Sequence, residues 1–204
     1  MGITARQFQQ MQERLAGKRG AERKSVGAIS VNGTAHSNHE TILGIDPSLR
    51  GTGYGVIRLG KPHPTALAHG TISIPASWEH SRCLAKIFET LRDVIARHQP
   101  TACVLEGLFY AQNLQTALIM GEARGASMVA AAHAGLEMFE ISPRKMKLAI
   151  VGYGAAQKSA VAKMVQRFLM LEEEPAPDAA DALALAIAFS QETSRFAIQS
   201  PKKI

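Results

Sequence analysis

The chain has 204 residues, 46% of them hydrophobic and 20% charged, with a formal net charge of +6 and a sequence pI near 9.5. These shares are those of a globular protein and exclude a collagen, a coiled coil or a wholly disordered chain. No apolar run approaches the roughly 20 residues that cross a bilayer, so we expect no membrane-spanning segment. Cys83 and Cys103 show neither disulfide nor metal spacing, and the N-terminus lacks a signal peptide's apolar core. A cytoplasmic location follows as the expectation.

The first 40 residues differ in composition from the rest of the chain. Six basic and three acidic residues there carry +3 of the net charge of +6. Apart from a few apolar residues at helical spacing, the segment is too polar to bury a core. We therefore predict a flexible N-terminal leader over residues 1–40, a folded domain over residues 41–190 and a short basic C-terminal tail over residues 191–204.

The folded domain begins with three strand-like stretches. An apolar run at 41–46 ends in Asp46, glycines punctuate a turn into a second strand at 54–59, and a third strand is expected around 67–74. Strands joined by short turns pair antiparallel, so these three predict a meander. Apolar residues at helical spacing then predict a helix over 78–98.

Strands and helices alternate in the second half of the domain. We predict strands at 102–105 and 137–141, a long Ala-rich helix over 114–134, and helices over 144–150, 158–171 and 178–189. Alternation of this kind indicates crossover connections and parallel strands. The predicted fold class is therefore α/β, with one five-stranded mixed sheet flanked by helices.

Four carboxylates are candidates for a metal site. Asp46 and Glu106 each end an apolar strand, where a charge is costly to bury unless a partner offsets it. Asp178 and Asp181 stand three residues apart at the start of a helix and can share one face. Hard oxygen donors without His or Cys suit Mg²⁺ or Mn²⁺, and such a cluster can support phosphodiester hydrolysis.

Three of these acids also have purely structural interpretations. Asp46 before Pro47 would cap a turn. Asp178 would be an N-cap, and Asp181 would then lie in the first helical turn, where it favours the helix dipole. Glu106 has no such alternative, because a strand end between Leu105 and Leu108 offers nothing to cap.

A block of basic residues lies between positions 141 and 171, without any Asp or Glu: Arg144, Lys145, Lys147, Lys158, Lys163 and Arg167. It is either a face for an anionic partner or a pair of solvated Lys-rich helices. The stretch 152–159 is not an NTPase P-loop, because Gln157 stands where that loop needs Gly. A helix that starts near Lys158 can still hold a phosphate.

Two other features have more than one interpretation. Phe109 and Tyr110 follow a strand end, where aromatic rings either stack on bases or are simply buried. Gly121 and Gly125 in the long helix are most simply close-packing contacts, with a self-association face as the alternative.

Five motifs follow one another along the chain: the run 42–47, the turn 52–56, Glu106 followed by Phe109, residues 123–125 and the run 178–183. Together they closely resemble the bacterial RuvC family of crossover junction endodeoxyribonucleases, over about residues 41–190. The resemblance implies a ribonuclease-H-like fold, a homodimer, and Mg²⁺-dependent nicking of two opposed strands of a four-way (Holliday) DNA junction in recombination and repair. It also implies cooperation with the branch-migration proteins RuvA and RuvB.

The resemblance assigns roles by position. Asp46, Glu106, Asp178 and Asp181 match the family's metal-binding catalytic acids, which implies two Mg²⁺ ions per subunit, with Mn²⁺ as a substitute. Lys158 matches a lysine at the active site and completes the candidate catalytic set. The candidate DNA contacts are Phe109, near the branch point, together with Arg124, Arg144, Lys147 and Lys158.

The chain departs from the family pattern in a few places. Ser48 stands where the family commonly has Gly, and Gln112 stands where some members have Lys. The end of the last helix lacks a His that is often found there, and the leader has no counterpart. These departures concern positioning and DNA contacts and leave the four acids in place.

Two other functions compete with a nuclease. An actin-like phosphotransferase also uses an Asp followed by a glycine-rich hairpin, but it needs two such lobes and a much longer chain. A non-catalytic junction-binding module would keep the fold and the charge, and the presence of all four acids argues against it.

Overall fold

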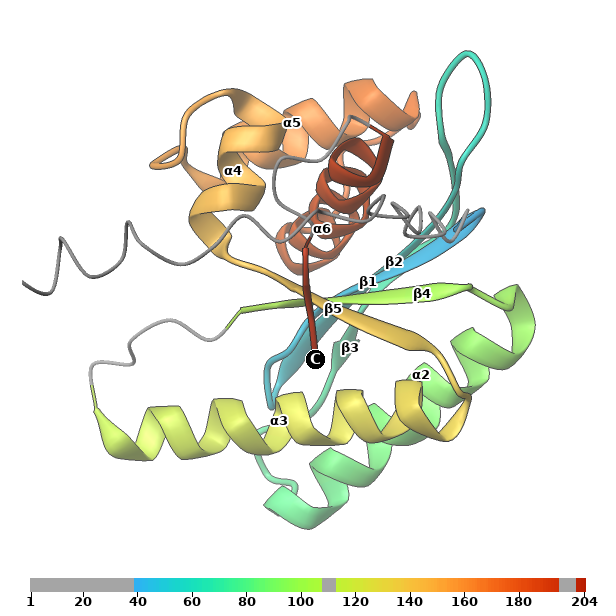
Figure 1. The fold of residues 1–204 in the computed structure, drawn as a ribbon. Coiled ribbons are helices and arrows are strands. Elements are labelled where there is room, and N and C mark those ends of the chain that lie inside the picture. Colours follow the sequence, from blue (N-terminus) through green and yellow to red (C-terminus); the bar gives the residue numbers. More distant parts are fainter. Residues whose placement is uncertain (1–38, 108–112, 195–200) are drawn as a thin grey trace, which may run out of the picture. The chain divides into compact units, whose positions relative to one another are not determined.

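One mixed sheet organises the described part of the chain, with helices on both faces (Figure 1). The computed structural model describes residues 39–107, 113–194 and 201–204, which belong to one compact unit. Within them the strands are β1 (Thr41–Asp46), β2 (Gly51–Arg58), β3 (Thr65–Ser73), β4 (Ala102–Glu106), β5 (Glu137–Ile141) and β6 (Lys202–Lys203). The helices are α2 (His80–His98), α3 (Leu114–His133), α4 (Pro143–Val151), α5 (Lys158–Leu169) and α6 (Pro177–Ser194).

The strand order β3-β2-β1-β4-β5-β6 confirms the predicted mixed α/β sheet. The first three strands pair antiparallel as a meander, whereas β4 runs parallel to β1 and β5 parallel to β4. Five strands are predicted from the sequence, and β6 is an additional one that pairs antiparallel with β5. Its two residues are too few to show an alternating pattern.

The predicted domain boundaries can be compared with the structure only within the described residues. The leader over residues 1–40 lies outside them except for its last two positions, so its flexibility stays a prediction. At the other end, α6 continues to Ser194 and β6 adds to the sheet. The described residues of the segment predicted as a tail, 191–194 and 201–204, therefore belong to the folded unit.

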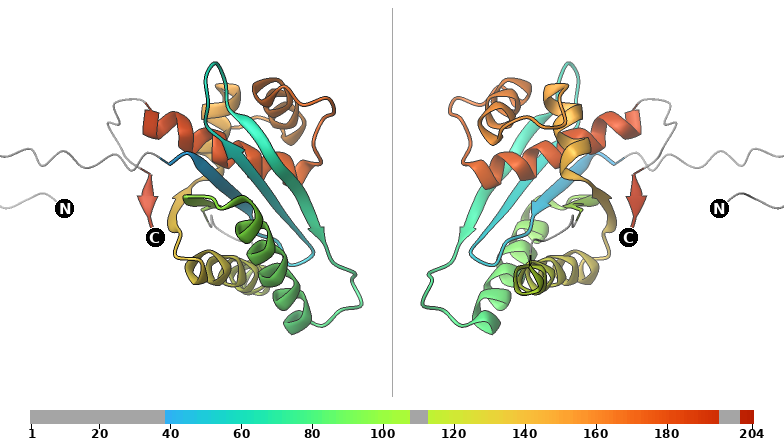
Figure 2. Two further views of the ribbon diagram at one scale, coloured as in Figure 1. Left: turned by 90° about the vertical axis from the view of Figure 1, so that its right-hand side faces the viewer. Right: turned by 90° about the vertical axis from the view of Figure 1, so that its left-hand side faces the viewer.

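Alternation along β1 sends neighbouring side chains to opposite faces of the sheet. Leu43 and Ile45 join the apolar cluster under α2 and α3, whereas Ile42 joins the cluster under α4, α5 and α6. Figure 2 shows these two helical layers on opposite sides of the sheet. Gly44 and Asp46 follow Ile42 at the period of two, so they lie on the α6 face.

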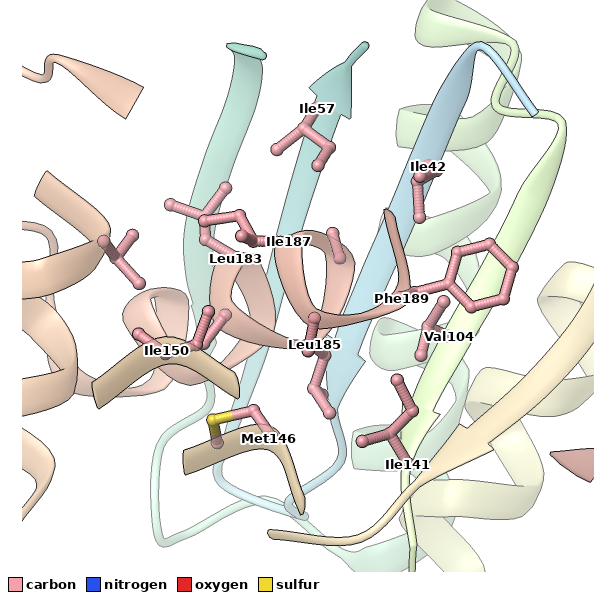
Figure 3. Packing of buried hydrophobic residues seen from close by; sticks show 14 of the residues in the cluster. Ile42, Ile57, Val104, Ile141, Met146, Ile150, Leu183, Leu185, Ile187 and Phe189 are labelled. Atoms are coloured by element: carbon pink, nitrogen blue, oxygen red, sulfur yellow. The ribbon is translucent and has the colours of Figure 1, made fainter. Parts of the chain in front are cut away.

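Helix α6 lies across the sheet and is apolar on nearly all sides. Leu183, Leu185 and Phe189 are fully buried against β1, β4 and the neighbouring helices α4 and α5 (Figure 3). A helix that is covered all round needs no polar face, which explains its Ala-rich and Leu-rich sequence. None of the described helices is long and apolar enough to span a bilayer.

Glycines in β1 and β2 let α6 approach the sheet closely. A Cβ at Gly44 would lie 1.9 Å from the carbonyl oxygen of Ala182, and one at Gly53 would lie 2.0 Å from that of Asp178. No side chain fits in either place, so the main chain of α6 rests directly on the strands. This contact fixes the distance between the first turn of α6 and the ends of β1 and β2.

Local signals set the limits of α4, a helix that packs against α6. The Ser142 side chain accepts a hydrogen bond from the Lys145 amide at 3.3 Å, and Pro143 occupies the start of the helix. Gly152 ends the helix with φ +80°, a left-handed conformation that favours glycine.

Candidate active site

Two carboxylates end neighbouring parallel strands. Asp46 is the last residue of β1 and Glu106 the last of β4, and the register pairs Ile45 with Leu105. The alternation of side chains puts both acids on the α6 face of the sheet. A hydrogen bond between the two carboxyls contributes to the pKa shift of each.

Helix α6 brings two more carboxylates to the same end of the sheet. Asp178 lies in its first turn, and Asp181, one turn later, is only 5% exposed. The Lys158 ammonium, from the start of α5, lies 2.9 Å from Asp181 Oδ2 and 4.0 Å from Asp178 Oδ1. The structure thus brings together the four acids and the lysine that the sequence singled out.

The acids perturb one another. Burial, and then the charges of Glu106 and Asp181, raises the pKa of Asp46 to about 8. Burial also raises the pKa of Glu106, although the hydrogen bond from Asp46 favours its ionised form. The pKa of Lys158 is raised as well: burial lowers it, but the hydrogen bond and charge of Asp181 outweigh that effect. A proton or a cation among these carboxyls relieves their repulsion.

The structural interpretations of Asp46 and Asp178 do not hold. The turn after β1 is closed by Thr52, whose hydroxyl accepts from the Ser48 amide at 3.2 Å and donates to the Ser48 carbonyl at 2.5 Å. The first α6 hydrogen bond runs from the Ala180 amide to the Ala176 carbonyl, so Asp178 lies inside the helix rather than at its N-cap.

The donors present fit a hard divalent cation in chemical type. They are carboxylate oxygens, and Asp181 Oδ1 is buried without a hydrogen-bond partner. As the side chains stand, no three His, Cys, Asp or Glu residues in the described ranges are arranged to enclose an ion. Lys158 instead supplies the positive charge at Asp181. The cluster therefore has the oxygen donors and the negative charge that a metal ion needs, and the Lys158 ammonium lies beside one of these donors, Asp181.

One basic side chain from α4, Lys147, acts on the cluster of acids. The charge of Lys147 acts on Glu106. A hollow of about 560 Å³ opens beside Lys147, lined also by Arg144, Lys145 and Leu148, and a second of about 580 Å³ lies between Arg144 and the 152–155 loop. No acidic residue of the described ranges lines either hollow, and Lys145 pairs with Glu192 at 2.9 Å. The described part of the basic block thus offers a cationic surface next to the acids.

One of the predicted DNA contacts, Arg124, does not lie at that surface. Arg124 is only 7% exposed, and its guanidinium faces the Glu106 carbonyl and the Glu140 carboxylate. The prediction that Arg124 contacts DNA therefore has no support in its placement, because its donors are engaged in the interior. Phe109 lies outside the described residues, so its role stays a prediction.

Helix α3 carries a stripe of exposed apolar and small residues. Its members stand three or four residues apart and so share one face. Leu114, Leu118 and Val129 are exposed, and Gly121 and Gly125 between them are half-buried. No described atom lies within 4 Å of a Cβ built on either glycine. The interpretation of these glycines as close-packing contacts within the chain is therefore wrong, and the alternative of a self-association face remains.

Sequence reasoning missed one residue of the site's surroundings, Glu140. It lies on β5, and its carboxylate accepts from Arg124 Nη2 at 2.6 Å. The available signal is the charge itself, because Glu140 stands between Phe139 and Ile141 in an otherwise apolar strand. Such a charge requires a partner, as Glu106 does.

A mixed sheet with carboxylates at the ends of its parallel strands and basic helices beside them defines a nuclease of the ribonuclease-H-like class. The family model described as crossover junction endodeoxyribonuclease RuvC matches residues 42–189. The chain belongs to this family.

Individual relatives agree with that assignment. RuvC of Akkermansia muciniphila is 47% identical over 146 residues, which are 72% of this chain and 87% of the relative. RuvC of Heliobacterium modesticaldum is 46% identical, over 72% of this chain and 91% of the relative. The solved structure of T. thermophilus RuvC in complex with a Holliday junction substrate has a TM-score of 0.73 and 30% identity, over 81% of this chain and 100% of that one. The yeast mitochondrial resolvase Ydc2, at 10% identity and a TM-score of 0.51, shares the fold alone.

Proposed function

We propose that this chain is a structure-selective endodeoxyribonuclease that resolves four-way DNA junctions by paired, Mg²⁺-dependent nicks in two opposed strands. The family supports the substrate, since T. thermophilus RuvC binds a Holliday junction in its solved structure. One observation carries the chemistry: Asp46, Glu106 and Asp181 gather at one end of the sheet beside Lys158.

The acids are the proposed ligands for the metal. Asp46, Glu106, Asp178 and Asp181 would hold Mg²⁺, and Mn²⁺ would substitute for it, with two ions per subunit as the family implies. Bound divalent cations supply an activated water and stabilise negative charge at the phosphate. The repulsion that raises the pKa of Asp46 supports the proposal, because cations relieve it as protons do.

Lys158 has a proposed role in both the metal-free and the working protein. In the metal-free chain its ammonium balances the buried charge of Asp181 at 2.9 Å. Once a cation meets that charge, Lys158 is available to a phosphate oxygen. Its exposed ammonium and its position at the start of α5 suit it to stabilise the charge that develops on a scissile phosphate.

The DNA backbone would lie along the cationic surface of α4. Arg144 and Lys147 line the hollow beside the acids, and their charges would neutralise phosphates. Phe109, from the segment after β4, is proposed to act at the branch point by family likeness. Binding through these groups is separable from catalysis by the acids, since they are different residues.

A homodimer would place two equivalent sites on two opposed strands. The exposed α3 stripe supports this arrangement, because Leu114, Leu118 and Val129 are 77%, 58% and 57% exposed and a two-fold contact would cover them. RuvA and RuvB are the proposed partners by family likeness. A chain that acts on chromosomal DNA with them would work in the cytoplasm.

The test is an incision assay on a synthetic four-way junction with each strand end-labelled in turn. We expect nicks in two opposed strands when Mg²⁺ is present and none in chelator. A linear duplex of the same sequence is the control and should stay intact. Incision without metal, or equal incision of the linear duplex, would overturn the proposed function, and junction binding without incision would favour a non-catalytic module.

A further inference from the structure

We propose that Arg124 and Glu140 are positioning residues for Glu106, and that this pair tunes metal binding and turnover rather than contacting DNA. The inference rests on the proposed function only in taking Glu106 as a metal ligand. It starts from a carboxylate that the sequence did not single out and from an arginine that the structure places in the interior.

Arg124 joins three elements at the end of β4. It projects from α3 and is only 7% exposed. Its Nη1 donates to the main-chain carbonyl of Glu106, and its Nη2 donates to Glu140 Oε2 on β5 at 2.6 Å. The planar guanidinium thus directs one donor at the peptide of the acid and the other at a fixed counter-charge.

The next residue along the chain is held as well. The Gly107 amide donates to the Ile141 carbonyl at 2.8 Å. A Cβ at Gly107 would lie only 3.2 Å from Cγ of Glu140, so the Glu140 side chain passes directly beside this peptide. The last peptide of β4 is therefore fixed on both sides: Arg124 holds the Glu106 carbonyl, and β5 holds the following amide.

A largely buried ion pair of this kind, in which the Glu140 side chain is 25% exposed, is weak evidence for stability. Removing two charges from water offsets much of the attraction between them, and an apolar pair of similar volume often serves a fold as well. What an apolar pair lacks is a directed donor for the Glu106 carbonyl. The geometry therefore points to Arg124 and Glu140 as residues that fix the main chain of Glu106 and so the position of its carboxylate.

The C-terminal strand adds a cation to this pair. Lys202 on β6 places its Nζ 3.5 Å from Glu140 Oε1, so each carboxylate oxygen of Glu140 has a positive partner. β6 lies beyond residues 42–189, which match the family model. We expect the exposed Lys202 to contribute less than Arg124, because solvent screens its charge.

The experiment uses the full chain and measures three quantities for Arg124→Gln, Arg124→Lys and Glu140→Gln. These are kcat and KM for junction incision, the affinity for Mn²⁺ by calorimetric titration without DNA, and Tm. The matched control is Glu137→Gln, which also removes a charge from β5, where Glu137 pairs with Lys203 at 2.5 Å instead of with Arg124. The control should keep wild-type kcat and Mn²⁺ affinity.

We expect Arg124→Gln and Glu140→Gln to lower kcat and Mn²⁺ affinity by about 10- to 100-fold, the usual effect of removing an outer partner of a metal ligand. KM should stay within about twofold, and Arg124→Lys should recover only part of the loss, because an ammonium lacks the two-pronged donor.

Three results would overturn the proposal. A rise in KM at constant kcat would make Arg124 a DNA contact. A fall in Tm alone would make the pair structural. Wild-type behaviour in every assay would remove any role. If Arg124→Gln does not fold, Glu140→Gln and Arg124→Lys decide the question, and the Mn²⁺ titration does so even if the wild type fails to cut junctions.

Discussion

Helix α6 buries side chains of opposite chemistry at two places along its length. Toward its C-terminus, Ile187 and Phe189 are buried in the apolar cluster that includes residues of β1 and β4. At its start, Asp181 is 5% exposed and shares its surroundings with Asp46 and Glu106. The same helix thus buries hydrocarbon at one end and carboxylates at the other.

The difference shows how one packing contact serves two purposes. Burial of the apolar end stabilises the fold, whereas burial of the acidic end opposes it until a cation or proton is present. The main chain of α6 contacts Gly44 and Gly53 directly, and this contact sets the distance between the helix and the sheet. The positions of the apolar and the acidic side chains of α6 therefore depend on each other. Packing of the apolar end thereby keeps the acids buried and close together, although their burial and mutual repulsion are unfavourable.

The largest expected effect breaks the apolar end. Phe189→Ala removes a fully buried ring that packs against Phe139 at 4.7 Å between centroids, and it should cost about 3–5 kcal/mol of unfolding free energy. Urea unfolding measures this. Phe88→Ala, at a half-buried position on the opposite face, is the control and should cost less. Equal losses of unfolding free energy in the two variants would contradict the larger contribution of α6 packing to stability.

The next effect concerns the acidic end. Lys158→Gln keeps a polar side chain but removes the ammonium beside Asp181, and kcat for junction incision should fall by about 10²- to 10³-fold, as when one donor that stabilises a developing charge is lost. Single-turnover incision measures this. Lys86→Gln, on the exposed side of α2, is a charge-matched control. A variant of Lys158 with wild-type kcat would remove its catalytic role.

The contact that couples the ends can be changed by one methyl group. Gly53→Ala places a Cβ against the Asp178 carbonyl, and overpacking of this kind costs about 1–3 kcal/mol. Because the clash lifts the first turn of α6, incision should fall as well. Gly60→Ala is the control, since its Cβ meets only the His63 carbonyl at an ordinary 3.6 Å. If Gly53→Ala cuts junctions at the wild-type rate, the spacing does not matter to the site.

The smallest effect sharpens the comparison from the acidic side. In chelator, Asp46→Asn should raise the unfolding free energy by about 1 kcal/mol, because it removes a buried carboxyl whose pKa is raised by burial and by Glu106 and Asp181. Mg²⁺ should then raise the Tm of the wild type and not that of the variant. A destabilised variant in chelator would contradict the repulsion.

The sequence was sufficient for the described helices, for the strands β1 to β5 and for singling out the four acids. The order of strands and helices follows from periodicity. Asp46 and Glu106 were detectable as charges at the ends of apolar strands, and Asp181 by its spacing from Asp178 at the start of a helix. The burial of Arg124 was not predictable, because its partners Glu106 and Glu140 lie 18 and 16 residues away, on two different strands. β6 was missed since pairing of two residues depends on the edge that β5 offers and not on its own pattern.

The most direct test compares the wild type with Asp46→Asn on one four-way junction, with binding and incision measured in the same Mg²⁺-containing samples. We expect the acids to be needed for incision and the basic surface to bind the DNA. The variant should therefore bind the junction with an affinity within a few fold of that of the wild type, while its incision is lost. Retained incision in Asp46→Asn, with binding intact, would contradict the assignment of the acidic end of α6 and β1 as the active site.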